Sequence, residues 1–242
     1  MYNKKLTNYA IILASGFGSR YGAEIPKQFS KIGEKTILEH TLDKFEGNSN
    51  IDKIILVITP SYIDFVKNIL QNNYKKIHRI IEGGELRKDS SYNGVFSIEE
   101  KEANVLIHDC ARPFVSQRII NDCVSALKKY SAINVAISST DTIIEVEDSL
   151  IKKIPNRENL MQVQTPQCFK LSLIKKAHKL SKNDNNFTDD CGLIIKHNLA
   201  DTFVVKGDVE NFKITYPNDF YLAEKILKNN TLNWGNESFN ML

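Results

Sequence analysis

The segment that most constrains the fold is the apolar run 9–13, which stops abruptly at a glycine-rich loop, residues 14–18. The run predicts a buried strand. The two glycines of the loop leave its backbone bare, so that N–H groups can turn towards an anion. Two permanent cations, Arg20 and Lys27, follow the loop. A bare loop with two cations beside it suits a triphosphate, whose charge must be held while one phosphorus is attacked.

Two better-known phosphate-binding loops are excluded by their spacing. A dinucleotide fingerprint, G-x-G-x-x-G, would need a third glycine at position 21, where the chain has Tyr21. A Walker A loop needs a Gly-Lys pair, and the chain contains none. The remaining alternative is an ordinary surface turn between a strand and a helix, because short glycine patterns also match by accident.

The composition is that of a soluble globular protein. The 242 residues suffice for one large α/β domain or two small ones, with 42% hydrophobic and 25% charged residues. The net charge of +3 does not indicate nucleic-acid binding, and no run approaches the ~20 apolar residues of a membrane helix. We expect a cytoplasmic protein. The cysteines lack C-x-x-C spacing, which favours buried free thiols at Cys110, Cys123, Cys168 and Cys191.

Apolar runs with strand character alternate with stretches of helical spacing through most of the chain. Further strands are expected at 54–58, 77–81, 105–107 and 133–137, and helices at 37–45, 62–70, 119–127 and 171–180. This alternation predicts an α/β fold, a doubly wound and mostly parallel sheet with helices on both faces. Ligands of such sheets bind at the carboxyl ends of strands, where the glycine loop lies. We expect one domain over residues 1–230 and a tail of unknown role, residues 231–242.

One segment departs from the alternation. Residues 142–146 and 150–154 predict two short strands on either side of the turn 147–149. They form a predicted β-hairpin that projects from the main sheet as an arm, at about residues 139–158.

Further candidate site residues follow other predicted strands. Asp109 and Arg112 come directly after the strand at 105–107, where a carboxylate could hold Mg²⁺ against phosphate oxygens. The alternative is an ion pair that caps a turn. A second glycine turn carries Gly84 and Ser90 and could hold a base or a ribose. Its alternative is an ordinary turn from strand to helix.

Two features late in the chain also stand out. Lys213 lies between two apolar residues of a predicted strand, 211–215, which is more notable than a lysine on a helix face. An edge strand would carry such a lysine as well. Residues 188–190 predict a helix N-cap with acids in the first turn.

The motifs together resemble one family. In chain order they read LASGFGSRYG, PKQF, HDCARPF, TDT, QTPQCF, FTDD and NFKIT. They are similar to the cytidylyltransferases that make CDP-activated polyols from 2-C-methyl-D-erythritol 4-phosphate or from ribitol 5-phosphate. The similarity covers about residues 8–228. It implies a nucleotidyltransferase fold with a β-arm that forms a homodimer, CTP and a polyol phosphate as substrates, and Mg²⁺ as cofactor.

The resemblance also implies residue roles. Arg20 and Lys27 would stabilise the α-phosphorus in the transition state, and Lys213 would orient the acceptor phosphate. The cytosine and ribose would be held by Leu13, Ala14, Ser15, Gly16, Phe17, Gly18, Gly84 and Ser90. Asp109 would act beside Mg²⁺ and the nucleotide. Arg112 would support that loop, while Thr142, Arg157 and Thr165 would reach the acceptor phosphate, partly from a neighbouring subunit. No protein nucleophile is expected, because the acceptor phosphate itself attacks.

Within the family the acceptor differs between the two groups, and we favour ribitol 5-phosphate for this chain. Methylerythritol enzymes commonly carry a basic residue on each side of the Asp-Thr of the arm, whereas residues 139–145 of this chain contain none. Residues 154–160 are similar to the ribitol group. Against this, 163–167 and 188–190 look like the methylerythritol group, which stays the alternative. A non-catalytic nucleotide-binding module, or an enzyme that uses another base or a sugar 1-phosphate, is a lesser alternative.

Overall fold

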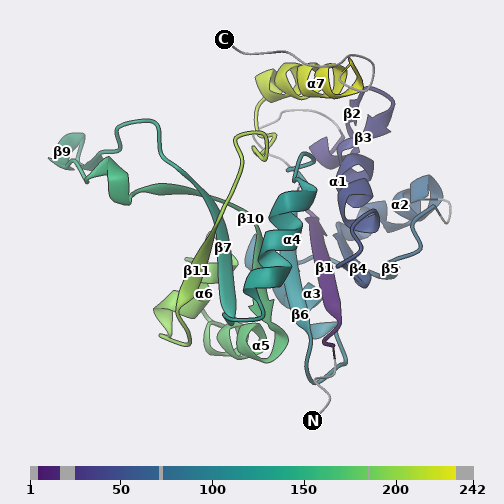
Figure 1. Cartoon of the computed structure of the whole chain (residues 1–242), viewed down its shortest axis with the longest axis horizontal. Helices are drawn as coiled ribbons and strands as arrows, with labels where there is room; N and C mark the ends of the chain where they lie inside the picture. Colours follow the sequence, from purple (N-terminus) through teal and green to yellow (C-terminus); the bar gives the residue numbers. More distant parts are fainter. Residues whose placement is uncertain (1–4, 17–24, 71–72, 185, 233–242) are drawn as a thin grey trace.

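The fold is built on one sheet of seven strands (Figure 1). The structure is a computed structural model, and it describes residues 5–16, 25–70, 73–184 and 186–232. In spatial order the strands are β11 (Thr202–Lys206), β7 (Ala132–Ser138), β10 (Met161–Lys170), β6 (Asn104–Asp109), β1 (Asn8–Ala14), β4 (Lys53–Ile58) and β5 (Ile77–Glu82). All neighbours run parallel except the two pairs that β10 makes. The predicted mostly parallel α/β sheet is confirmed.

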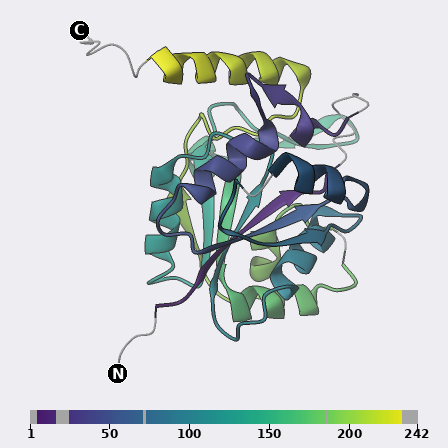
Figure 2. The ribbon, with the colours of Figure 1, turned by 90° about the vertical axis from the view of Figure 1, so that its right-hand side faces the viewer.

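Helices cover both faces of this sheet (Figure 2). One face packs against α1 (Ile37–Glu46), α2 (Ile63–Leu70) and α4 (Gln117–Ala126), while α7 (Pro217–Leu232) joins the same core from beside β2 (Lys31–Ile32), beyond the end of the sheet (Figure 1). The other packs against α3 (Arg87–Phe96), α5 (Leu171–Leu180) and α6 (Asp190–Lys196). Short 3₁₀ turns occupy η1 (Lys27–Phe29), η2 (Pro60–Tyr62) and η3 (Arg157–Asn159), and β2 (Lys31–Ile32) pairs with β3 (Lys35–Thr36).

The apolar run of β1 is explained by burial on two sides. Its side chains alternate, so that Ile12 joins the core beneath α1 and α2 while Ile11 joins the core beneath α3. Both are 0% exposed. A strand that is covered on both faces needs apolar residues at every position, which is why this segment shows no polar alternation.

The order of the strands brings the predicted site residues to one edge. β1 lies between β6 and β4, so the direction of winding reverses beside it. Leu13 pairs with Asp109 in the parallel ladder, and both strands end within a residue of that pair. The glycine loop and the Asp109 segment therefore leave the sheet side by side, at the place where such sheets bind ligands.

The predicted arm is present but shorter than expected. β8 (Glu145–Glu147) and β9 (Leu150–Lys153) form a separate two-stranded sheet that stands off from the core in Figure 1. Asp148 and Ser149 at its turn both have positive φ, as a type I′ hairpin requires. The prediction of strand at 142–144 was wrong. In this register Ile143 would face Pro155, which has no N–H to donate to a ladder.

The predicted strand 211–215 was also wrong, because this segment is irregular. Its backbone is joined to the core by isolated hydrogen bonds, such as the one from the Ile214 N–H to the Ala111 carbonyl, rather than by a β-ladder. Sequence reasoning did not anticipate β10, β11 or the long α7. The cysteine prediction held: all four are buried and free. No helix among the described residues has the length and apolarity to cross a bilayer.

Gly94 offers a test of how closely α3 packs on β1. A Cβ atom at this position would lie 2.5 Å from Cγ2 of Ile11, in a fully buried contact. We expect Gly94→Ala to lower the free energy of unfolding by about 1–3 kcal/mol, although alanine favours helix, because the overpacked side chains cannot move apart. Urea unfolding measures this. Ser125→Ala, at an exposed position of α4, should stay within about 0.5 kcal/mol of the wild type; equal stability of both variants would contradict the contact.

Candidate active site

A cavity of about 230 Å³ opens at the carboxyl ends of β1 and β6. The predicted site residues that line it are Leu13, Ala14, Ser15, Gly16, Lys27, Gly84, Ser90, Asp109 and Lys213. Residues from four distant parts of the chain thus meet in one place. Phe17, Gly18 and Arg20 lie outside the described residues.

The two glycine turns of the sequence contact each other. A Cβ atom at Gly83 would lie 2.2 Å from the Cβ of Ser15, so only glycine permits this approach. The hydroxyl oxygens of Ser15 and Ser90 are 2.7 Å apart. Ser90 in turn accepts a hydrogen bond from the backbone N–H of Gly84 at 3.1 Å. The wall of the cavity is therefore one connected unit, in which each turn fixes the position of the other.

The turn η1, which contains the PKQF motif, holds the glycine loop from the other side. The buried amide of Gln28 donates to the carbonyl of Ala14 at 2.7 Å. The ammonium group of Lys27 donates to the carbonyl of Ile214 at 2.7 Å, beside Lys213. This motif thus positions the loop through Gln28 and brings the Lys27 cation to the cavity.

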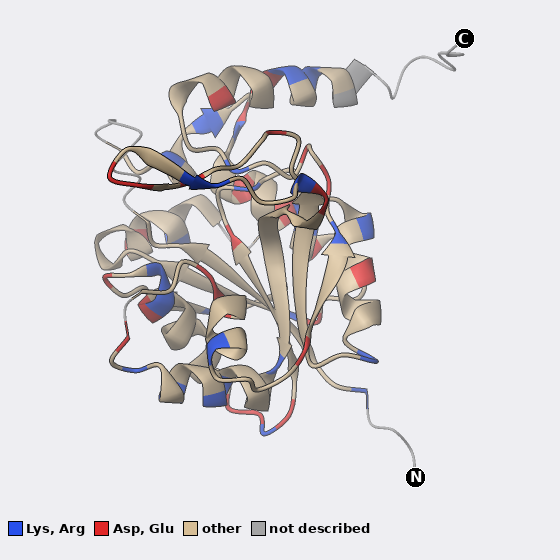
Figure 3. Cartoon of the chain, turned by 90° about the vertical axis from the view of Figure 1, so that its left-hand side faces the viewer, with Lys and Arg blue, Asp and Glu red and all other residues tan. Residues whose placement is uncertain are grey.

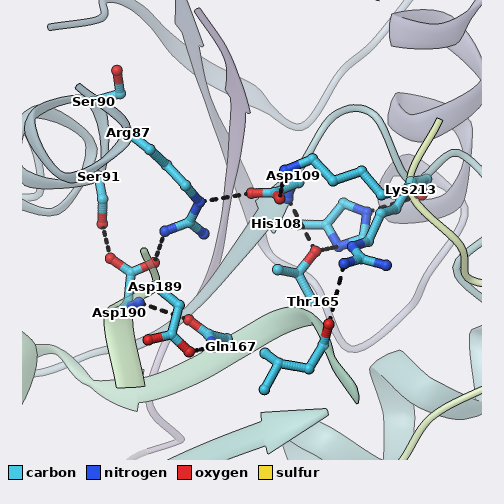
Figure 4. A network of polar contacts seen from close by, with 12 residues as sticks. Arg87, Ser90, Ser91, His108, Asp109, Thr165, Gln167, Asp189, Asp190 and Lys213 are labelled. Carbon is cyan, nitrogen blue, oxygen red and sulfur yellow. Dashed lines mark hydrogen bonds and ion pairs between the residues drawn. The ribbon is translucent and has the colours of Figure 1, made fainter. Parts of the chain in front are cut away.

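Asp109 lies at the centre of the polar residues in Figure 4. Its Oδ1 accepts from Nε of Arg87 at 2.9 Å, and its Oδ2 accepts from Nζ of Lys213 at 2.7 Å. Burial alone would raise the pKa of Asp109, but the charges of Arg87 and Lys213 outweigh it and hold the pKa well below its ordinary value. The carboxylate therefore stays ionised at the cavity.

Arg87 is a site residue that sequence reasoning missed. Its NH1 donates to Oδ2 of Asp190 at 2.8 Å, so that one guanidinium joins two carboxylates. Burial opposes its charge, but Asp109 and Asp190 raise its pKa. A signal was available, because Arg87 is the first residue of α3, and a cation is unfavourable at a helix N-terminus. Such a residue implies acids nearby.

Thr165 and His108 support Asp109 from behind. The Thr165 hydroxyl accepts from the backbone N–H of Asp109 at 3.1 Å and lies 3.0 Å from Nδ1 of His108. Nε2 of His108 must donate to the Arg112 carbonyl, 3.1 Å away, since a carbonyl only accepts. Nδ1 therefore accepts from Thr165. Burial lowers the pKa of His108 to about 4, which keeps the ring neutral.

Arg112 supports the loop around the cavity. Its NH1 donates to the Asn211 carbonyl at 2.8 Å and its NH2 to the Val163 carbonyl at 3.2 Å. Burial lowers its pKa. Among the described residues its Nε has no hydrogen-bond partner. Arg112 ties the strand β10 to the segment that carries Lys213.

Two predicted acceptor residues lie on the arm rather than at the cavity. Thr142 is exposed, and Arg157 in η3 donates to the carbonyl of Thr140 at 3.1 Å. Neither lines the cavity that the described residues form. Within one chain the structure thus brings together Lys213 and those predicted nucleotide residues that it describes, but not these two.

Comparison with known proteins shows the family to which this chain belongs. The family model described as IspD, 2-C-methyl-D-erythritol 4-phosphate cytidylyltransferase, matches residues 9–229. The 2-C-methyl-D-erythritol 4-phosphate cytidylyltransferase of Clostridium perfringens (strain SM101) is 41% identical over 221 residues, which cover 90% of this chain and 98% of that protein. The chain belongs to this family. It is a CTP-dependent cytidylyltransferase that acts on a polyol phosphate, as the resemblance implied.

A second relative carries a different activity in its name. The bifunctional ribulose 5-phosphate reductase/CDP-ribitol pyrophosphorylase Bcs1 of Haemophilus influenzae is 39% identical over 231 residues. These cover 93% of this chain, and the chain spans 49% of the length of that relative.

Solved structures agree with the fold of the family. The 4-diphosphocytidyl-2C-methyl-D-erythritol synthase of Anaerococcus prevotii has a TM-score of 0.82 at 31% identity, covering 92% of this chain and 96% of its own. The Francisella tularensis 2-C-methyl-D-erythritol 4-phosphate cytidylyltransferase has a TM-score of 0.77 at 32% identity, covering 90% and 99%. This cytidylyltransferase therefore shares its architecture with structures of the family.

The contact between the two glycine turns yields a prediction for nucleotide binding. Gly83→Ala should weaken CTP binding by about tenfold or more, equivalent to about 1.4 kcal/mol, because the new Cβ displaces Ser15 and the loop. The double variant Ser15→Gly/Gly83→Ala, which removes the clashing Cβ, should recover much of that loss. Calorimetric titration with CTP measures both. Equal affinities of the two variants would show that the turns do not act as one unit.

Proposed function

We propose that the chain transfers CMP from CTP to 2-C-methyl-D-erythritol 4-phosphate and releases pyrophosphate. The family model and the Clostridium relative, of which the chain covers 98%, support this acceptor. The proposal reverses the preference for ribitol 5-phosphate drawn from the arm. The reason is that the arm argument rests on a few exposed residues, whereas the family model matches residues 9–229 and the Clostridium relative covers 90% of this chain.

The cavity carries the proposal, because its charges suit the transfer of a phosphoryl group. Lys27 and Lys213 both line it, and the bare loop at Gly16 supplies backbone N–H groups. Lys27, together with Arg20, would hold the triphosphate and stabilise charge that develops at the α-phosphorus. Lys213 would orient the acceptor phosphate, whose oxygen attacks in line.

The residues at the cavity also fit Mg²⁺. Mg²⁺ commonly takes one or two carboxylates together with substrate phosphates, and Asp109 supplies a buried, ionised carboxylate. Among the described residues there is no group of three His, Cys, Asp or Glu side chains that could hold a metal alone. We therefore propose that Asp109 holds the ion jointly with CTP. The bound ion would neutralise phosphate charge.

The arm supports the proposal of a homodimer. Apolar side chains stand exposed along it, at Ile143, Ile144, Val146, Leu150, Ile151 and Ile154. An apolar strip of this kind on a projecting hairpin is expected to be covered by another protein surface. A second copy of the chain would cover it, and would also bring Arg157 and Thr142 towards a neighbouring cavity. Light scattering at micromolar concentration tests this; a monomer would contradict it.

Ribitol 5-phosphate is the second candidate, and two observations favour it. The stretch around Asp141 and Thr142 lacks basic residues and is exposed. Figure 3 shows the arm from the side to which it projects. The Haemophilus relative, 39% identical, is named as a CDP-ribitol pyrophosphorylase. Fewer cations would suit an acceptor that the arm holds through hydroxyl groups.

The acceptor is decided by pyrophosphate release with CTP and Mg²⁺. We expect a kcat/KM for 2-C-methyl-D-erythritol 4-phosphate that exceeds that for ribitol 5-phosphate by more than tenfold. The opposite ratio would assign the chain to ribitol 5-phosphate. Tight binding of CTP without release on either acceptor would point to another polyol phosphate or to a non-catalytic module.

Lys27 provides a test of the charge stabilisation. Lys27→Ala should lower kcat by about 10²–10³-fold, as removal of one preorganised charge-stabilising donor does in other enzymes. The exposed Lys31 serves as the control, since it lies nearby but does not line the cavity. Lys31→Ala should keep its kcat. Near-normal turnover of folded Lys27→Ala would remove Lys27 from the reaction.

A further inference from the structure

The Asp109 site continues inward as a row of alternating charges. From the cavity it runs Lys213, Asp109, Arg87, Asp190, each joined to the next by an ion pair of 2.7 to 2.9 Å. Figure 4 shows Arg87 between the two carboxylates. The four residues come from an irregular segment, β6, α3 and α6. The row therefore links the cavity to the first residues of α3 and α6, which cover the same face of the sheet.

The two ends of this row differ in exposure. The side chain of Lys213 is 36% exposed and that of Asp190 1%, while Asp109 and Arg87 between them are 11% and 25% exposed. Both cations that share Asp109 line the cavity, but they are held differently. Lys213 comes from a segment that pairs in no β-ladder, whereas Arg87 begins a helix and also binds a second, buried carboxylate, that of Asp190. Only Lys213 can turn to an anionic substrate without leaving a buried charge unpaired.

Asp190 is itself held in place by hydrogen bonds with buried side chains. Its Oδ1 accepts from the hydroxyl of Ser91, which lies 3.2 Å from Nε2 of His178. Its backbone N–H donates to Oε1 of Gln167 at 2.8 Å. Ser91 and His178 are 0% and 2% exposed, so this Ser-His-Asp group cannot meet a substrate. It fixes the carboxylate that faces Arg87.

We propose that Arg87 and Asp190 form a positioning pair for cytidylyl transfer. Asp190 keeps Arg87 on Oδ1 of Asp109, so that Asp109 stays fixed when Lys213 exchanges the carboxylate for a substrate phosphate. The pair acts on the reaction through Asp109 and Lys213. This inference rests on the proposed roles of those two residues at the cavity.

Two substitutions test the pair. Arg87→Lys keeps the charge but cannot bridge two carboxylates, because lysine lacks the planar fork of arginine. Asp190→Asn can keep the bond from Ser91 only by turning its NH₂ group towards the guanidinium. For each we expect kcat to fall by about 10- to 100-fold, as small displacements of reacting groups do. The KM for CTP should change less than threefold, and CTP should still raise the Tm.

The double variant separates positioning from independent effects. If Asp190 acts through Arg87, the kcat of Arg87→Lys/Asp190→Asn should equal that of the poorer single variant rather than fall by the product of the two losses. Arg79→Lys is the matched control, since Arg79 pairs with Glu99 at the surface, away from the cavity. It should keep the wild-type kcat. Folded Arg87→Lys with a kcat within twofold of the wild type would overturn the proposal, as would multiplicative losses.

A milder variant covers the case in which the charged pair is needed for folding. Ser91→Ala leaves both charges in place and removes the hydroxyl that holds Asp190. We expect its kcat to fall by about three- to tenfold with an unchanged KM for CTP; a wild-type kcat would overturn the pair. All variants are compared on the polyol phosphate that the wild type uses. A wild type that prefers ribitol 5-phosphate would therefore defeat the proposed acceptor and leave the test of the pair intact.

Discussion

The site depends on one constraint, the placement of an ionised carboxylate in a nearly closed environment. Asp109 is 8% exposed, and a buried charge without partners would cost several kcal/mol. Arg87 and Lys213 offset that cost from two sides. To pair this carboxylate, the start of α3, the end of β6 and the segment before α7 must come together. The need to neutralise one buried charge thus constrains how distant parts of the chain are placed.

The sheet makes that convergence possible. Strands buried on both faces fix where each loop emerges, and the reversal of winding beside β1 opens a space between the loops after β1 and β6. The close approach of Gly83 to Ser15 then joins the loop after β1 to the turn before α3, and both line the cavity. Chemistry is thus confined to loops, while the position of each loop is set by apolar packing.

The sequence predicted the parts whose signals are local. The run 9–13 and the alternation of strands and helices reflect burial pattern, and they gave the doubly wound sheet correctly. β10 was missed because its residues 164–167 are mostly polar and include Pro166. They can nevertheless be buried because their side chains form hydrogen bonds, such as the one from Gln167 to Asp189. Lys213 was assigned to a strand because its neighbours are apolar. Arg87 was overlooked because its role depends on Asp190, about a hundred residues away.

The separation of the arm from the core has a consequence for how such enzymes diverge. β8 and β9 pair only with each other, and their side chains are exposed in the described chain. Substitutions there alter few contacts that stabilise the fold, whereas substitutions around Asp109 disturb buried charges. The arm, which we propose reaches the acceptor, can therefore change in sequence while the residues around Asp109 stay fixed. A single scaffold can in this way serve more than one metabolic pathway over evolutionary time.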